Sequence, residues 1–223
     1  MAPHKRWLVA SAVLALVAYA FLWTGYALQW NWLTSLDAAA LRLSYQNGEA
    51  RPDWVVAWDV FCTVLGPGAF RLFTVVLIIL ALARRNVRIA MFLVISVELA
   101  GLVTEAAKAA ADRPRPDTAF VSALGTAFPS GHALGVLVAV LALLTVALPV
   151  TRASLRGWLI ALGAVVVVGI GIGRVILNVH HPSDVLAGWA LGYAYFAFCL
   201  LVLPPSNPIT EADETPAVPG TSR

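Results

Sequence analysis

The chain has 223 residues, of which 60% are apolar and only 12% are charged. A soluble domain carries about 25% charged residues, so this chain has too little charge to cover a globule of its size with polar surface. Its mean hydropathy of +0.82 agrees. The composition excludes a cytosolic enzyme, a disordered chain and a nucleic-acid-binding protein, and the small net charge of +3 indicates no nucleic-acid partner. We therefore expect an all-α integral membrane protein.

A membrane-crossing helix needs about 20 apolar residues, and six segments come close to that length. They are residues 7–28, 69–83, 87–111, 133–150, 157–177 and 184–203. The first also resembles a signal peptide, because Ala18-Tyr19-Ala20 looks like a cleavage site, but the apolar run continues beyond it and favours a retained helix. The second is the shortest and carries Arg71 near its start, so we expect that side chain to reach the membrane surface.

These segments predict one six-helix membrane domain over residues 1–203. Within it, residues 29–68 form the longest connection and contain four tryptophans. Tryptophan prefers the lipid headgroup layer, so we expect this segment to lie along the outer membrane surface. Residues 204–223 hold five prolines and no apolar run, which indicates a disordered cytoplasmic tail.

Short loops rich in Lys and Arg usually face the cytoplasm. With the N-terminus inside, the cytoplasmic segments carry seven Lys and Arg residues. The outer loops carry three, once four cations that belong to polar clusters are set aside. The count predicts a multi-pass protein of the plasma (inner) membrane with both termini in the cytoplasm and the polar clusters on the outer face.

Three polar clusters interrupt the apolar pattern, at residues 108–116, 129–132 and 173–184. On the six-helix map they fall at the outer ends of the third to sixth helices, which indicates a single site. The cations of the site are Lys108, Arg113, Arg115 and Arg174. Together with two histidines, and without a matching number of carboxylates, they indicate an anionic ligand, and guanidinium groups suit phosphate oxygens.

The local sequence predicts how each cluster is presented. Prolines at 114 and 116 end the third helix. Ser130 suits the N-cap of the fourth helix, and Gly131 lets a phosphate approach the free N–H groups there. Pro182 suits the first position of the sixth helix, so that Asp184, in its first turn, can reach back to His180. Such a contact would fix the tautomer of His180 and leave its other nitrogen free as a nucleophile.

The histidines and acids of these clusters could also serve other roles. His132, His180, His181 and Asp184 could bind a metal, but the neighbouring cations would repel it, so we expect no metal and no cofactor. Glu105 either forms a local ion pair with Lys108 or positions it.

The three clusters resemble the motifs of the type 2 phosphatidic acid phosphatase superfamily, in which Lys-x6-Arg-Pro is followed by Pro-Ser-Gly-His and by Ser-Arg-x5-His-x3-Asp. The matching residues are Lys108 with Arg115-Pro116, the run Pro129-Ser130-Gly131-His132, and Arg174 with His180 and Asp184. One position departs, because Gly173 stands where the family has a phosphate-binding serine. Ser183 or Asn178 is a candidate substitute donor.

The resemblance implies a phosphohistidine mechanism. His180 is the nucleophile, Asp184 orients it, and His132 protonates the leaving oxygen. The phosphate is held by Lys108, Arg115, Ser130, Gly131 and Arg174. Arg113 contacts either the substrate or lipid headgroups. The acid–base pairing predicts a bell-shaped pH dependence of the rate.

The resemblance favours a metal-independent lipid-phosphate phosphatase at the outer membrane face. Its substrate would be phosphatidic acid, phosphatidylglycerol phosphate or a polyprenyl pyrophosphate, among which the sequence does not choose. Two alternatives stay open: a phosphotransferase that discharges the same phosphohistidine onto an acceptor, and a non-catalytic lipid-binding or transport protein. Vanadate-dependent haloperoxidases share the residue pattern but are soluble, which the apolar spans disfavour. The oligomeric state is not predicted.

Overall fold

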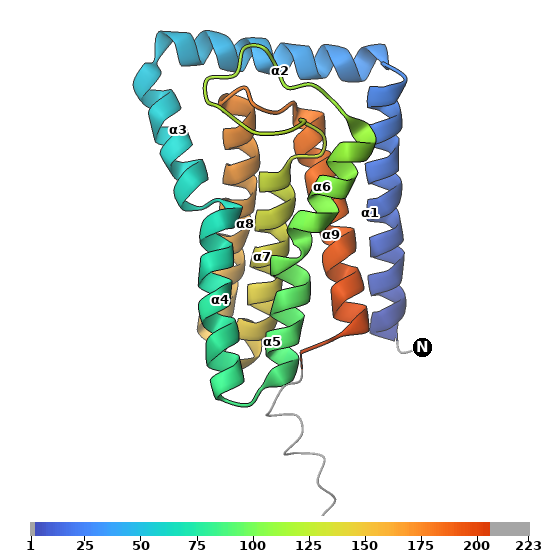
Figure 1. Ribbon diagram of the computed structural model, residues 1–223, viewed down its shortest axis with the longest axis vertical. Helices are drawn as coiled ribbons and strands as arrows, with labels where there is room; N and C mark the ends of the chain where they lie inside the picture. The colour runs from blue at the N-terminus through green and yellow to red at the C-terminus, as the bar shows by residue number, and fades with distance from the viewer. Residues whose placement is uncertain (1–2, 206–223) are drawn as a thin grey trace, which may run out of the picture.

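Helices form most of the computed structural model, which describes residues 3–205 (Figure 1). Within these residues there are nine α-helices, one π-helical turn (η1) and one 3₁₀ turn (η2). In chain order they are α1 (Pro3–Ala27), α2 (Asn31–Ala50), α3 (Pro52–Val64), α4 (Pro67–Ala83), α5 (Val87–Leu93), η1 (Val94–Glu98), α6 (Ala100–Ala111), α7 (Gly131–Ala147), η2 (Leu148–Val150), α8 (Ala153–Ile176) and α9 (Pro182–Val202). The tail expected beyond residue 203 lies almost wholly outside the described residues.

Six segments of the described chain are long and apolar enough to cross a membrane. They are Lys5–Ala27, Pro52–Ala83, Val87–Ala111, Gly131–Val150, Ala153–Ile176 and Pro182–Val202. Large apolar side chains are exposed along their outer surfaces, for example Leu72 on α4 and Trp158 on α8, as expected of helices that face lipid. The all-α membrane architecture is confirmed.

The second span differs from the expected one. It begins at Pro52 rather than at residue 69, and it is built from α3 and α4, which meet at Gly66 and Pro67. Only α2 lies across the end of the bundle, whereas α3 runs beside α8 (Figure 1). Arg71 therefore does not mark the start of this span, as expected from the sequence, but lies well inside it.

Glycines on α8 explain why α3 packs beside α8 and does not lie along the membrane surface. A methyl group built at Gly169 would lie 2.9 Å from Phe61, and one at Gly173 would lie 2.8 Å from Trp58. Small residues four apart on one helix let a neighbouring helix approach closely. Trp58 thus packs against α8 instead of lying among headgroups.

Helices α7 and α9 pack closely beside the polar clusters. A methyl group at Gly188 would lie 2.6 Å from the carbonyl oxygen of Ser130, and one at Gly192 would lie 3.1 Å from that of Leu134. The backbone N–H of Ser130 also donates to the carbonyl oxygen of Asp184 at 2.9 Å. These contacts fix the starts of α7 and α9 relative to each other.

The third span contains a π-helical turn at Val94–Glu98, where the N–H of Leu99 donates to the carbonyl oxygen of Val94 at 3.2 Å. The hydroxyl of Tyr195 on α9 donates to the carbonyl oxygen of Ile95. Such turns recur at functional sites, and this one separates α5 from α6, which carries Lys108.

The start of α1 and the end of α9 both lie at the end of the bundle opposite α2 (Figure 1). The two helices pack along each other, and the hydroxyl groups of Ser11 and Tyr193 are hydrogen-bonded at 2.8 Å.

Candidate active site

The three polar clusters meet beneath α2. Lys108 lies in the last turn of α6, and Arg113 and Arg115 follow it in an extended segment. Ser130 is the N-cap of α7, as expected, and its hydroxyl accepts from the N–H of Ala133 at 3.5 Å. Arg174 lies in the last turn of α8.

A cavity of about 370 Å³ lies at this end of the bundle. Six of the expected site residues line it, namely Lys108, Arg115, Gly131, His132, Arg174 and His180. Asp59 and Thr63 of α3 also line it, and the sequence did not indicate them because α3 was expected on the membrane surface. Ser130 and Asp184 are fully buried behind the wall of the cavity.

The imidazole of His180 has a defined tautomer. Arg115 Nη1 lies 3.2 Å from His180 Nε2. Because a guanidinium can only donate, Nε2 must accept, so the ring proton is assigned to Nδ1. Nδ1 lies 3.6 Å from Asp184 Oδ2, just beyond hydrogen-bonding distance. Burial lowers the pKa of His180 to about 4, against the opposing effect of the Asp184 carboxylate, so the ring is neutral at pH 7.

Asp184 makes its close contacts elsewhere. Pro182 opens α9, as expected, but the capping box closes on His181 rather than on His180. Asp184 Oδ2 accepts from the backbone N–H of His181 at 2.8 Å and lies 3.1 Å from His181 Nδ1. The residue before a helix is the one that an acid at the third helical position reaches, which explains the difference.

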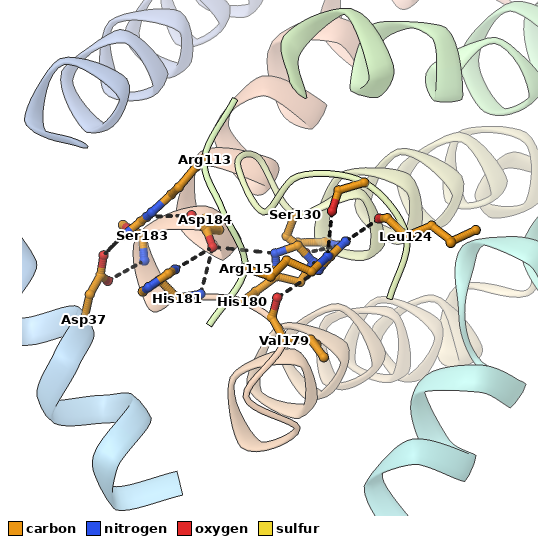
Figure 2. Close-up of polar contacts among 12 residues, drawn as sticks. Asp37, Arg113, Arg115, Leu124, Ser130, Val179, His180, His181, Ser183 and Asp184 are labelled. Atoms are coloured by element: carbon orange, nitrogen blue, oxygen red, sulfur yellow. Dashed lines mark hydrogen bonds and ion pairs between the residues drawn. The ribbon is translucent and has the colours of Figure 1, made fainter. Parts of the chain in front are cut away.

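A buried ionic network connects Asp184 to α2 (Figure 2). Arg113 Nη1 donates to Asp184 Oδ1 at 2.6 Å and to Ser183 Oγ at 2.7 Å. Arg113 Nη2 donates to Asp37 Oδ2 at 2.9 Å, and Asp37 Oδ1 accepts from the N–H of Ser183 at 3.0 Å. Arg113 is 7% exposed and Asp37 2%. Arg113 and Ser183 are therefore committed to protein partners.

Asp37 was not expected from the sequence, and Ser183 contacts Asp37 in the structure. Asp37 is one acid on a segment expected to lie on the membrane, and no motif includes it. Ser183 was a candidate phosphate donor, but its hydroxyl donates to Asp37 and faces away from the cavity. Asn178, the other candidate donor, is buried, adopts a φ of 55° and does not line the cavity either.

Arg115 is held from several sides. Its Nη1 donates to the carbonyl oxygen of Val179 at 2.8 Å, Nη2 to that of Leu124 at 2.8 Å, and Nε to that of Gly125 at 2.9 Å (Figure 2). Burial lowers the pKa of Arg115. These contacts attach the loop between α6 and α7 to the segment that carries His180.

Two cations of the cavity have spare donors. Lys108 Nζ lies 3.8 Å from Glu105, whose side chain is largely exposed. Arg174 is 5% exposed, and within the described residues it has no ion pair and its Nε has no hydrogen-bond partner. A buried, unpaired charge is costly. An anion in the cavity would satisfy both groups.

Gly173 is required by its surroundings. A methyl group there would lie 2.5 Å from Cys62 Sγ and 2.8 Å from Trp58. The space that a serine would need is therefore taken by two side chains of α3.

Within residues 3–205, no three His, Cys, Asp or Glu side chains are arranged to hold a metal ion. The cavity is lined instead by Lys108, Arg115 and Arg174. The site thus has the charge of an anion-binding site.

The fold and the site together define a multi-pass helical membrane protein with a cation-lined cavity beneath one end of its bundle. The model of the PAP2 superfamily matches residues 89–208, more than half of the chain. The chain belongs to the PAP2 superfamily, as its motifs led us to expect.

Two known proteins are similar to it. One is an undecaprenyl-diphosphatase from Sulfolobus acidocaldarius, 30% identical over 143 residues. That match takes in 61% of this chain and 65% of the relative, so less than two thirds of the relative's length is matched. The other is the crystal structure of a transmembrane PAP2-type phosphatidylglycerolphosphate phosphatase from Bacillus subtilis. Its fold agrees with a TM-score of 0.72 at 24% identity, over 86% of this chain and 95% of the other.

Proposed function

We propose that this protein is a membrane lipid-phosphate phosphatase that works through a phosphohistidine on His180. The main observation is that the neutral imidazole of His180, whose tautomer is defined, shares one cavity with Arg174, a buried cation that has no ion pair within the described residues. Nε2 of His180 faces the cavity side, where Arg115 donates to it, and Nδ1 is directed at Asp184. Family membership and the curated relative's name, undecaprenyl-diphosphatase, support the same class of reaction.

The chemistry proceeds in two steps. His180 Nε2 attacks phosphorus, the bond to the leaving oxygen breaks, and His132 donates a proton to that oxygen. Water then attacks phosphorus and gives a proton to His132, the phosphorus–nitrogen bond to His180 breaks, and phosphate leaves. Arg115 exchanges its contact with Nε2 for the phosphate oxygens, and Lys108, Arg174 and the N–H groups at the start of α7 stabilise the charge.

The substrate is a phosphomonoester or pyrophosphate of a lipid, such as phosphatidic acid, phosphatidylglycerol phosphate or a polyprenyl pyrophosphate. Fixed cations take the place of a metal in this scheme. The excess of Lys and Arg at the end of the bundle opposite α2 supports a cytoplasmic position for both termini and an outer-face position for the cavity.

Phosphate release by the detergent-purified protein tests the proposal. Phosphatidic acid and a polyprenyl pyrophosphate are assayed with EDTA present, for the wild type, His180→Ala and the matched histidine control His4→Ala. We expect release that persists in EDTA, is retained in the control and is lost in His180→Ala, together with an acid-labile phosphoprotein only where His180 is present.

Release that survives in His180→Ala would refute the mechanism. Release that depends on an added acceptor alcohol would identify a phosphotransferase. Ligand binding without turnover in the wild type would identify a binding protein.

A further inference from the structure

A second cavity, of about 450 Å³, lies on the other side of His132. It is bounded by α4, α6 and α7, and it shares Lys108, Gly131 and His132 with the first cavity. His180, Arg115 and Arg174 line only the first cavity. His132 thus lies between the first cavity, which contains His180, and the second cavity, to which the proposed reaction assigns no role.

Arg71 projects into this second cavity from α4. A methyl group built at Gly101 would lie 2.4 Å from Arg71 Nη2, so the guanidinium rests against the bare backbone of α6. Gly101 precedes Thr104 by three residues, about 4.5 Å along a helix. A methyl group at Gly131 would lie 3.0 Å from Thr104. The guanidinium is therefore about one turn deeper in the bundle than His132.

Arg71 is a charged residue inside a candidate membrane span. Within residues 3–205 it forms no hydrogen bond and no ion pair, although it lies inside a candidate span. Charged side chains inside a membrane are costly and usually serve a function. Its guanidinium keeps all its donors for something that enters the cavity.

Two carboxylates also line this cavity, and their positions matter. Glu105 is paired with Lys108. Glu98 has a buried oxygen without a hydrogen-bond partner and lies about one turn deeper than Gly101. A group that enters past His132 therefore meets Arg71 before Glu98.

The geometry of phosphoryl transfer indicates which part of the substrate would occupy the second cavity. The attacking and leaving atoms lie roughly in line on opposite sides of phosphorus. With His180 on one side and His132 protonating the leaving oxygen, the leaving group and its lipid lie on the second-cavity side. A monoester leaves as a neutral alcohol, whereas a lipid diphosphate leaves as a phosphate that still carries negative charge.

We propose that Arg71 forms a subsite for the phosphate that stays on the lipid, so that this chain favours lipid diphosphates over lipid monophosphates. The inference rests on the proposed phosphatase function and adds the substrate class. A guanidinium matches phosphate oxygens in shape and charge. Arg71 stabilises the leaving group as its negative charge develops, beside the proton that His132 supplies.

A matched substrate pair tests this subsite. Farnesyl diphosphate and farnesyl monophosphate have the same tail and differ only in the second phosphate. We expect Arg71→Gln to lower kcat/KM for the diphosphate at least tenfold and to change that for the monophosphate less than twofold. Gly101→Ala keeps the charge but places a methyl group where the guanidinium lies, so it should act in the same direction. Arg88→Gln, at an exposed position on α5, is the control and should change neither.

The outcomes separate the subsite from the reaction. Equal losses on both substrates, or no loss on the diphosphate in either variant, would overturn the subsite. So would a wild-type protein that cleaves the monophosphate and not the diphosphate, although the phosphatase function would then stand. A wild-type protein that releases phosphate from neither would remove both proposals.

Discussion

Asp37 and Arg113 form a buried ion pair of 2.9 Å across 76 residues of sequence. The pair attaches α2, which lies across the end of the bundle, to the segment that leaves α6. Because Arg113 also donates to Asp184 at 2.6 Å, the orientation of Asp184 depends on a helix that the family model does not include.

Asp37→Asn should therefore lower both stability and turnover. The amide keeps the size of the side chain but loses the charge, which leaves the Arg113 guanidinium with one buried carboxylate instead of two. Removal of one partner of a buried pair costs about 3–5 kcal/mol, and we expect a tenfold fall in kcat with little change in KM. Thermal unfolding and phosphate release measure the two effects.

Asp117→Asn is the control for Asp37→Asn, since Asp117 is exposed. It should leave the melting temperature and kcat unchanged. A wild-type kcat in Asp37→Asn would show that the orientation of Asp184 does not depend on the pair between Asp37 and Arg113.

The acid side of the pH profile should report His180. Burial lowers the pKa of this imidazole to about 4, so the ring stays neutral and nucleophilic until the pH falls to that value. We expect kcat/KM to fall only below about pH 4, as the acid limb of a bell-shaped profile. If kcat/KM instead began to fall near pH 6.5, the ordinary pKa of histidine (about 6.5), the effect of burial on His180 in the free enzyme would be contradicted.

Restoring the family serine at residue 173 should be harmful here. The new Cβ would lie 2.5 Å from Cys62 Sγ and 2.8 Å from Trp58, and overpacking of this kind costs about 1–3 kcal/mol. Gly173→Ser should lower the melting temperature. Adding Cys62→Ala should recover part of the loss, because it removes the nearer atom.

A double-mutant cycle over these two sites measures the coupling. Contacting residues give non-additive effects, so the double variant should be more stable than the sum of the single variants indicates. Strictly additive changes in stability would show that the serine side chain does not contact Cys62.

The contact between α7 and α9 should be equally sensitive. Gly188→Ala places a methyl group 2.6 Å from the backbone oxygen of Ser130, which must move α7 and with it His132. We expect the melting temperature and kcat to fall together. Gly157→Ala, on α8 with no atom within 4 Å of the new methyl group, is the matched control and should stay within about 0.5 kcal/mol of the wild type.

The sequence predicted what depends on composition and local signals. The apolar runs located five spans to within four residues of those in the structure, because a helix that crosses lipid must be long and apolar. The N-cap at Ser130 and the start of α9 at Pro182 were also predictable, since both follow from local chain geometry.

The remaining features depend on contacts between distant residues. The tryptophan-rich segment looked interfacial, but Trp58 packs on Gly173, which only the pairing of α3 with α8 reveals. The π-helical turn at Val94–Glu98 contains no Gly or Pro from which it could have been predicted. Asp37 looked like any surface acid because its partner, Arg113, is contributed by another part of the chain.

The pairing of α1 with α9, recorded by the bond between Ser11 and Tyr193, has a consequence for biosynthesis. Because α1 is made before α9, it meets this neighbour only after every helix between them has been made. The network that joins Asp37 to Ser183 and Asp184 likewise cannot form until these two residues have been made, about 150 residues later. The network around Arg113 is therefore completed only when α9 is made, and a chain interrupted before α9 lacks both Ser183 and Asp184.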